Sequence, residues 1–77
     1  MKTKQATMFG EIIEIRKRTY LSSRRTGGNT TKLASAWFFF TGTAELLAEV
    51  VGGRVRQCRL DWDYQAGEWT NPILLND

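Results

Sequence analysis

The sequence predicts an α+β fold: a small, curled, antiparallel β-sheet in the order ββαββ, with one short helix packed on it. Three observations lead to this prediction. Segments 8–21 and 54–63 alternate apolar and polar residues, as strands with one buried face do. Segment 33–40 is apolar at both parities, which is typical of a strand covered on both faces. Segment 44–51 has helical spacing. A small, partly open barrel is the alternative architecture.

The first predicted strand covers residues 8–21, and its side chains divide by parity. Those expected on the buried face are Phe9, Ile13 and Ile15. Those expected on the solvent face are Glu14, Arg16 and Arg18. Ile12 breaks the alternation, and Gly10 indicates a bulge or a close approach of two backbones.

Segment 22–31 is polar, contains Gly27-Gly28 and has no periodicity, so it is predicted to be a flexible basic loop. If the strands before and after it pair antiparallel, the loop closes a long hairpin. Residues 1–7 are predicted to be a flexible tail. With 77 residues, the chain is expected to form a single domain over 1–77.

Segment 33–40 is predicted to be the central strand, with Trp37 in the core, and it leads into the helix. The residues on the apolar face of this helix are Ala44, Leu47, Ala48 and Val51. Thr43 is the expected N-cap, with Thr41 or Gly42 as alternatives. Gly52-Gly53 is expected to end the helix, because glycine adopts the left-handed conformation readily.

The last two strands are predicted to form a hairpin. Alternation over 54–63 places the apolar side chains on one face: Cys58, Leu60, Trp62 and, just beyond, Tyr64. A four-residue loop at 65–68 would pair Tyr64 with Trp69 and Leu60 with Ile73, whereas a three-residue loop would mix the two faces. Pro72 cannot donate a backbone hydrogen bond, so the last strand is expected at a sheet edge.

Composition bounds the chemistry. The chain has one cysteine and no histidine, which excludes an intramolecular disulfide and a multi-cysteine zinc site and removes the usual acid–base residue. We therefore predict a protein that is not an enzyme, with no cofactor, no metal site and a buried, unreactive Cys58. No segment has the ~20 apolar residues needed to cross a bilayer, and no signal peptide is recognisable. A cytoplasmic location is expected.

The charge distribution predicts an anionic partner. Six basic residues and no acidic residue lie between Glu14 and Glu45: Arg16, Lys17, Arg18, Arg24, Arg25 and Lys32. We expect this basic hairpin and loop to contact the phosphates of nucleic acid, or else an acidic protein surface. Trp62 and Trp69 are expected to cap the core together with Tyr64. If they lie instead on an open face beside Arg59, Arg59, Trp62 and Trp69 would form a secondary contact, because exposed aromatic rings stack on bases.

A second class of function fits the same features. A chain this small and basic could be a protein–protein inhibitor or adaptor of the kind phages and mobile elements encode, for example an anti-CRISPR-like inhibitor docking on a host protein. Exposed aromatic residues or an open sheet edge would form the interface. The same edge could also pair two copies of the chain into a homodimer.

Overall fold

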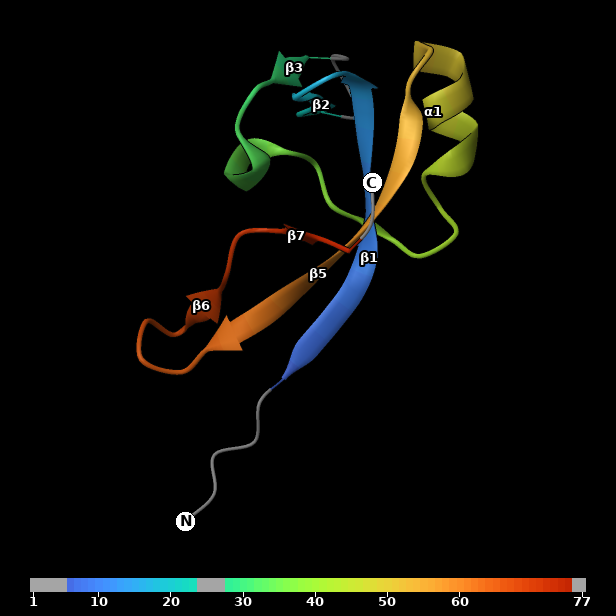
Figure 1. Cartoon of the computed structure of the whole chain (residues 1–77). Coiled ribbons are helices and arrows are strands. Elements are labelled where there is room, and N and C mark those ends of the chain that lie inside the picture. Colours follow the sequence, from blue (N-terminus) through green and yellow to red (C-terminus); the bar gives the residue numbers. More distant parts are fainter. Residues whose placement is uncertain (1–5, 24–27, 76–77) are drawn as a thin grey trace.

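The computed structural model of the chain describes residues 6–23 and 28–75. It contains a small antiparallel sheet and one α-helix, which confirms the α+β class (Figure 1). Its elements in chain order are β1 (Thr7–Arg16), β2 (Thr19–Leu21), β3 (Asn29–Thr30), the 3-10 helix η1 (Leu33–Ser35), β4 (Phe39–Phe40), α1 (Glu45–Val51), β5 (Arg54–Asp63), β6 (Glu68–Trp69) and β7 (Ile73–Leu74). Within the described ranges four strands precede the helix and three follow it, so the order is not ββαββ.

The two ten-residue strands, β1 and β5, form the centre of the sheet. They pair antiparallel along nearly their whole length, from Thr7 opposite Asp61 to Glu14 opposite Arg54. The order across the sheet is β3-β2-β1-β5-β6, with β4 also pairing with β1 and β7 with β5. Figure 1 shows the two long strands side by side, with β2, β3 and α1 near one end and β6 near the other.

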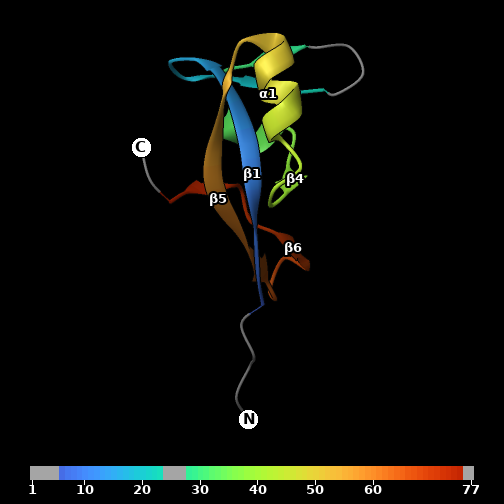
Figure 2. The same ribbon diagram turned by 90° about the vertical axis from the view of Figure 1, so that its right-hand side faces the viewer.

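β1 is the strand that is covered on both faces. Its neighbouring residues Ile12 and Ile13 point to opposite faces, and both are fully buried. One core lies under α1 and contains Ile13, Leu21, Phe39, Ala44 and Ala48. The other contains Ile12, Tyr20 and Cys58, with Leu33, Ala36, Phe38 and Leu74 packed against it. Figure 2 shows α1 lying against one face of the β1–β5 pair.

The prediction that 33–40 is the central strand was therefore wrong. The segment begins with η1, and only Phe39–Phe40 pairs with β1. Trp37 is 43% exposed and Phe40 68% exposed, so neither belongs to the core. The neighbours Phe38 and Phe39 enter the two cores on opposite faces of β1. The apolar residues at both parities therefore belong to a segment that lies at the edge of β1 and contributes to both cores, not to a central strand.

Four details of the first half also differ from the prediction. Strand β1 ends at Arg16, and a turn at Lys17 and Arg18 leads into β2. The expected faces do not hold, because Phe9 is largely exposed and Glu14 is buried. Strand β3 forms inside the predicted loop 22–31, and β1 begins at Thr7, inside the predicted tail. The loop residues Arg24 and Arg25, like positions 1–5 of the tail, lie outside the described residues.

Helix α1 confirms the predicted apolar face and ending. Ala44 and Ala48 are buried, with Leu47 and Val51 packed against the same core. Gly52 ends the helix in the left-handed conformation at φ 74°. The predicted N-cap was wrong: the cap position is Ala44, and the Thr43 hydroxyl donates to the Phe40 carbonyl. The buried Glu11 carboxylate accepts the Ala44 N–H instead, at 3.3 Å, and places negative charge at the positive end of the helix.

The C-terminal hairpin has a different register from the predicted one, and it keeps the predicted parity between β5 and β6 but not between β5 and β7. Trp62 pairs with Trp69, so the four-residue loop is 64–67 and not 65–68. The Asp63 carboxylate accepts hydrogen bonds from two loop N–H groups, and Gly67 has a left-handed φ of 70°, which together fix the turn earlier than expected. Ile73 pairs with Arg59 rather than with Leu60. Pro72 lies between β6 and β7, where no ladder hydrogen bond is required of it.

The close contact at Gly10 gives a first prediction. A Cβ at this position would overlap the Phe38 ring and the Phe39 carbonyl oxygen, because β4 packs directly on β1 here. Gly10→Ala should lower the free energy of unfolding by about 2 kcal/mol through overpacking, measured by urea denaturation. Gly42→Ala is the matched control, since its Cβ meets no atom within 4 Å. Gly42 has a φ of 87°, so this control costs only backbone strain, about 1 kcal/mol. Equal losses in both variants would contradict the packing explanation.

Candidate functional site

A cavity of about 710 Å³ lies where the β1–β2 turn faces the start of β5. The end of β1, the turn, β2, the α1–β5 connection, β5 and β7 all contribute to its lining. The apolar and backbone parts of the wall come from Ile15, Tyr20, Gly52, Gly53 and Leu74. Segments that are nearly forty residues apart in the sequence therefore meet in one concave surface.

The charged lining of this cavity is strongly positive. Its cationic side chains are Arg16, Lys17, Arg18, Arg54 and Arg56. Among the lining residues that the structure describes, the one carboxylate is Glu14. Five cations against one anion leave an excess of four positive charges in a space the size of a small-molecule site. We call this feature the cationic cavity.

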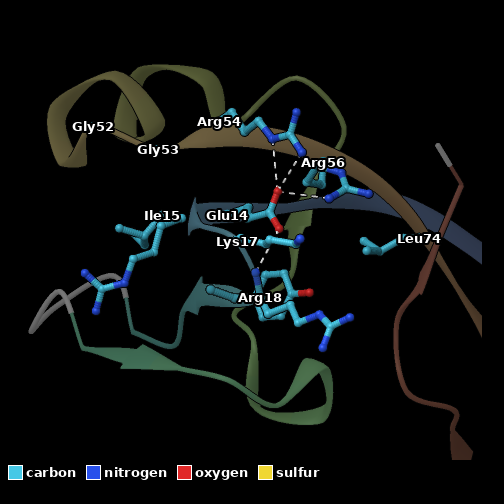
Figure 3. Close-up of a pocket in the computed structure, with 11 residues that line it drawn as sticks. Glu14, Ile15, Lys17, Arg18, Gly52, Gly53, Arg54, Arg56 and Leu74 are labelled. Carbon is cyan, nitrogen blue, oxygen red and sulfur yellow. Dashed lines mark hydrogen bonds and ion pairs between the residues drawn. The ribbon is translucent and has the colours of Figure 1, made fainter. Parts of the chain in front are cut away.

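The Glu14 carboxylate joins the two sides of the cationic cavity (Figure 3). Its Oε1 accepts hydrogen bonds at 2.9 Å from Arg54 Nε and from Arg56 Nη1. Its Oε2 accepts the backbone N–H of Arg18 at 3.3 Å. Figure 3 shows the carboxylate between the two guanidinium groups and the turn that carries Lys17 and Arg18. Glu14 therefore holds β5 and the turn in fixed relative positions.

Two opposing effects act on the pKa of Glu14. Burial raises the pKa, because it disfavours the charged carboxylate. Hydrogen bonds from the side chains of Arg56 and Arg54 and from the Arg18 N–H lower it, and together they outweigh burial. The net pKa lies below the ordinary value of 4.5, so Glu14 is ionised at neutral pH.

The register of β1 and β5 determines how deep each arginine lies. Glu14 pairs with Arg54 and Ile12 with Arg56, which places both arginines on the same face of β5. Arg56 is 6% exposed and forms the inner wall, whereas the Arg54 side chain is 63% exposed at the rim. A Cβ on Gly53 would lie 2.8 Å from the Glu14 carbonyl oxygen. The close approach of the backbone before β5 to the backbone of β1 therefore requires glycine at this position.

The turn supplies the opposite rim. Lys17 and Arg18 are both exposed. Arg18 has a φ of 59°, in the left-handed region, which is unfavourable for residues other than glycine. The hydrogen bond from its N–H to Glu14 stabilises this conformation. No glycine or asparagine marks residues 17–18, which is why the alternation pattern alone extended the strand through them.

Two smaller hollows adjoin the cationic cavity, and they differ in charge. One, of about 430 Å³, shares Arg16 with the cavity and is otherwise lined by Thr19, Asn29, Thr30 and Thr31. We call it the threonine groove. The other, of about 390 Å³, shares Gly53 and Arg54 with the cavity and contains three carboxylates, those of Glu11, Glu45 and Glu49. An anionic ligand is therefore attracted on one side of the cavity and repelled on the other.

The structure brings together three of the predicted binding residues and separates others. Arg16, Lys17 and Arg18 line one cavity, whereas Lys32 is exposed but lies outside its lining. Arg24 and Arg25 lie outside the described residues.

The predicted secondary contact lies elsewhere. Arg59 lies on the opposite face of β5 from Arg54, with its Nε 3.6 Å from Asp61 Oδ2. Trp62 and Trp69 pack edge to face, with ring centroids 5.3 Å apart, and Trp69 remains partly exposed. They sit eight or more residues along the hairpin from Arg54, roughly 26 Å at the rise of a strand. The aromatic pair and the cationic cavity are therefore separate surfaces.

The sequence prediction missed Arg54 and Arg56, which complete the cavity. They lie beyond Glu45, outside the run without acidic residues that identified the others. Their spacing of two at the start of a strand was an available signal, because it places both on one face. Glu14 was predicted to face solvent, so its role in connecting Arg54 and Arg56 to the turn was not predicted.

The remaining groups considered are Cys58 and the possible metal ligands. Cys58 is fully buried, as predicted. Its burial, and to a smaller extent the nearby charge of Glu11, raises the pKa of the thiol from 9.0 to about 11. In the part of the chain that the structure describes, no three Cys, Asp or Glu side chains gather as a metal site. Of the helices described, none is long and apolar enough to cross a membrane.

Comparison of the chain with protein-family models, curated proteins and solved structures finds no match in any of the three.

Proposed function

We propose that this chain is a small, non-enzymatic, cytoplasmic protein that binds nucleic acid by placing phosphates at the cationic cavity. The supporting observation is that five cationic residues line one concave surface. Arginines and lysines scattered over a surface keep a protein soluble, but clustered ones create a local potential that concentrates anions. Phosphate groups are the anions that nucleic acid presents at regular intervals, and arginine matches their geometry.

The buried ion pair supports binding through positioning. Arg54 bonds Glu14 through Nε and Nη2, both at 2.9 Å, so its guanidinium is held at the rim while its exposed edge faces solvent. A side chain that is already ordered loses less conformational entropy when it binds. Lys17 and Arg18 stand on the facing rim, where a phosphate between the two sides would be contacted from both.

A salt titration of binding tests the proposal. Fluorescence anisotropy with internally labelled single-stranded DNA, single-stranded RNA and duplex should show binding near ~50 mM salt. The logarithm of the association constant should fall with the logarithm of salt by about 0.7 per phosphate contacted on single strands and about 0.9 on duplex. The double variant Lys17→Gln/Arg18→Asn should reduce both affinity and slope. Asparagine is chosen at position 18 because it tolerates the left-handed backbone.

Arg59→Gln is the matched control for charge. It removes one positive charge, as each cavity substitution does, but from the opposite face of β5 and about 17 Å from Arg54 along the strand. The double variant should melt within a few degrees of the wild type, since both side chains are exposed. No binding of the wild type near ~50 mM salt, or equal weakening by Arg59→Gln, would overturn the proposal.

A second candidate function is a protein–protein inhibitor or adaptor of the phage or mobile-element type, anti-CRISPR-like in its use. The observation that favours it is on α1, where Leu46 and Val50 are each 75% exposed one turn apart, beside Glu45 and Glu49. Exposed apolar side chains on one helical face resemble the centre of a protein interface. This candidate predicts a wild type without nucleic-acid affinity and a host-protein complex that Leu46→Gln/Val50→Gln disrupts.

A further inference from the structure

We propose that the cationic cavity receives the terminal phosphate of a single nucleic-acid strand, and that the adjoining strand continues past Arg16 into the threonine groove. This inference rests on the proposed function and specifies its ligand: a phosphomonoester at a strand end rather than the phosphodiesters within a strand. Three features of the described residues support it, namely the depth of the cavity, its charge and the groove beside it.

The depth of the cavity favours a chain end. Arg56 is 6% exposed in the wall of the cavity, whereas Arg54, Lys17 and Arg18 are exposed at its rims, so an anion that enters meets these rims first. A phosphodiester inside a strand carries a sugar on both sides, which keeps it at the mouth of such a space. A terminal phosphate has one covalent neighbour and three further oxygens, and it can enter first. The volume of about 710 Å³ suits one or two nucleotides and is far too small for a duplex.

The charge of the lining favours a dianion. Glu14 neutralises part of the field of Arg54 and Arg56, yet an excess of four positive charges remains among the lining residues described. A phosphodiester brings about one negative charge, whereas a phosphomonoester brings about 1.5 to 2 at neutral pH because its second pKa is about 6. The monoester therefore gains more from the same cations, and its three oxygens can accept from arginines on both rims.

The threonine groove favours a polymer over free phosphate. It shares Arg16 with the cavity, so the two spaces adjoin at that residue. Its hydroxyl and amide groups come from Thr19, Asn29, Thr30 and Thr31, which are the side-chain types that commonly contact phosphate and sugar oxygens. On the other side of the cavity the hollow with Glu11, Glu45 and Glu49 repels a phosphate backbone. The strand thus has one favourable exit.

Binding of matched oligonucleotides tests this inference. The wild-type protein is titrated, by isothermal calorimetry at one salt concentration, with a decanucleotide that carries a 5′-phosphate, a 3′-phosphate or hydroxyls at both ends. We expect one of the phosphorylated forms to bind about tenfold more tightly than the hydroxyl form. Arg54→Gln should remove most of that preference, and Arg59→Gln should leave it intact.

The groove has its own variant and probe. A nucleoside monophosphate should bind more weakly than the phosphorylated decanucleotide, because it leaves the groove empty. Thr31→Val removes an exposed hydroxyl from the groove, so it should weaken the decanucleotide and leave the monophosphate unchanged. Equal affinity of the two probes for the wild type would overturn the groove assignment.

The outcomes separate this inference from the function beneath it. If all three decanucleotides bind equally and in a salt-dependent way, the protein binds internal phosphates and the terminal-phosphate assignment is wrong. If none of them binds, the proposed function itself fails. A phosphoserine peptide that binds as tightly as the phosphorylated decanucleotide would also overturn the assignment, because it would show recognition of phosphate without nucleic acid.

Discussion

Phe39→Ala should leave the chain largely unfolded at room temperature. Phe39 is 6% exposed and lies between β1 and α1, in the same core as Ile13, Ala44 and Ala48. Truncating a buried phenylalanine costs about 3–5 kcal/mol, since the cavity it leaves cannot fully collapse. A domain of this size has only about 5 kcal/mol of stability to lose. Circular dichroism with a urea titration should therefore show loss of the cooperative transition.

Phe40→Ala is the matched control, because it removes the same ring from the adjacent position of the same strand. Phe40 is 68% exposed and points to the opposite side of β4 from Phe39. Its loss should change the free energy of unfolding by no more than about 0.5 kcal/mol. A Phe39→Ala protein that unfolds with nearly the wild-type midpoint would show that the core under α1 is not what stabilises the fold.

The helix could be predicted from the sequence because its determinants are local. Spacing of three and four residues defined the face that packs on the sheet, and Gly52 defined the end. The N-cap failed because its replacement is not local. The carboxylate at the helix start comes from Glu11, 33 residues away, and no capping pattern near Thr43 could indicate it.

The central strand was misassigned because a run of apolar residues has more than one structural origin. Segment 33–40 contains four aromatic side chains against one in β1, yet it lies at the edge of β1 and supplies Phe38 to one core and Phe39 to the other. The signal for β1 was the pair Ile12-Ile13, two neighbouring β-branched residues that break the alternation. A single break is weak evidence against a run of four aromatic residues, and only the pairing partners decide between them.

The sequence predicted three of the five cationic residues that line the cavity. Charge alone found Arg16, Lys17 and Arg18, because an excess of cations is visible in any stretch of sequence. The placement of the other two depends on Glu14 pairing with Arg54 across 40 residues, which no local pattern specifies. Acidic residues on a strand are normally expected in water, so a carboxylate buried to hold arginines in place contradicts the rule from which the faces were assigned.

Glu14→Gln should lower the free energy of unfolding by about 3 kcal/mol at pH 7. Removing one partner of a buried ion pair costs about 3–5 kcal/mol. The lower end applies here because Arg54 is mostly exposed and glutamine still offers one carbonyl oxygen. The glutamine NH₂ group, however, would meet another donor, the N–H of Arg18, in its left-handed conformation. Urea denaturation measures the loss, and Glu49→Gln, an exposed carboxylate on α1, is the charge-matched control.

The pH dependence distinguishes loss of the ion pair from a simple packing defect. The pKa of Glu14 is lower in the folded chain than its ordinary value of 4.5, so the stabilisation from its ionised form is complete above pH 4.5. It is lost as the pH falls through the lowered pKa of the folded state, where wild-type Glu14 becomes protonated and neutral like glutamine. The difference in unfolding free energy between the wild type and Glu14→Gln should therefore be largest near pH 7 and shrink progressively below pH 4.5. A difference that stays constant down to the acid limit of folding would mean that the charge of Glu14 contributes nothing, and that the turn and β5 are held together by packing alone.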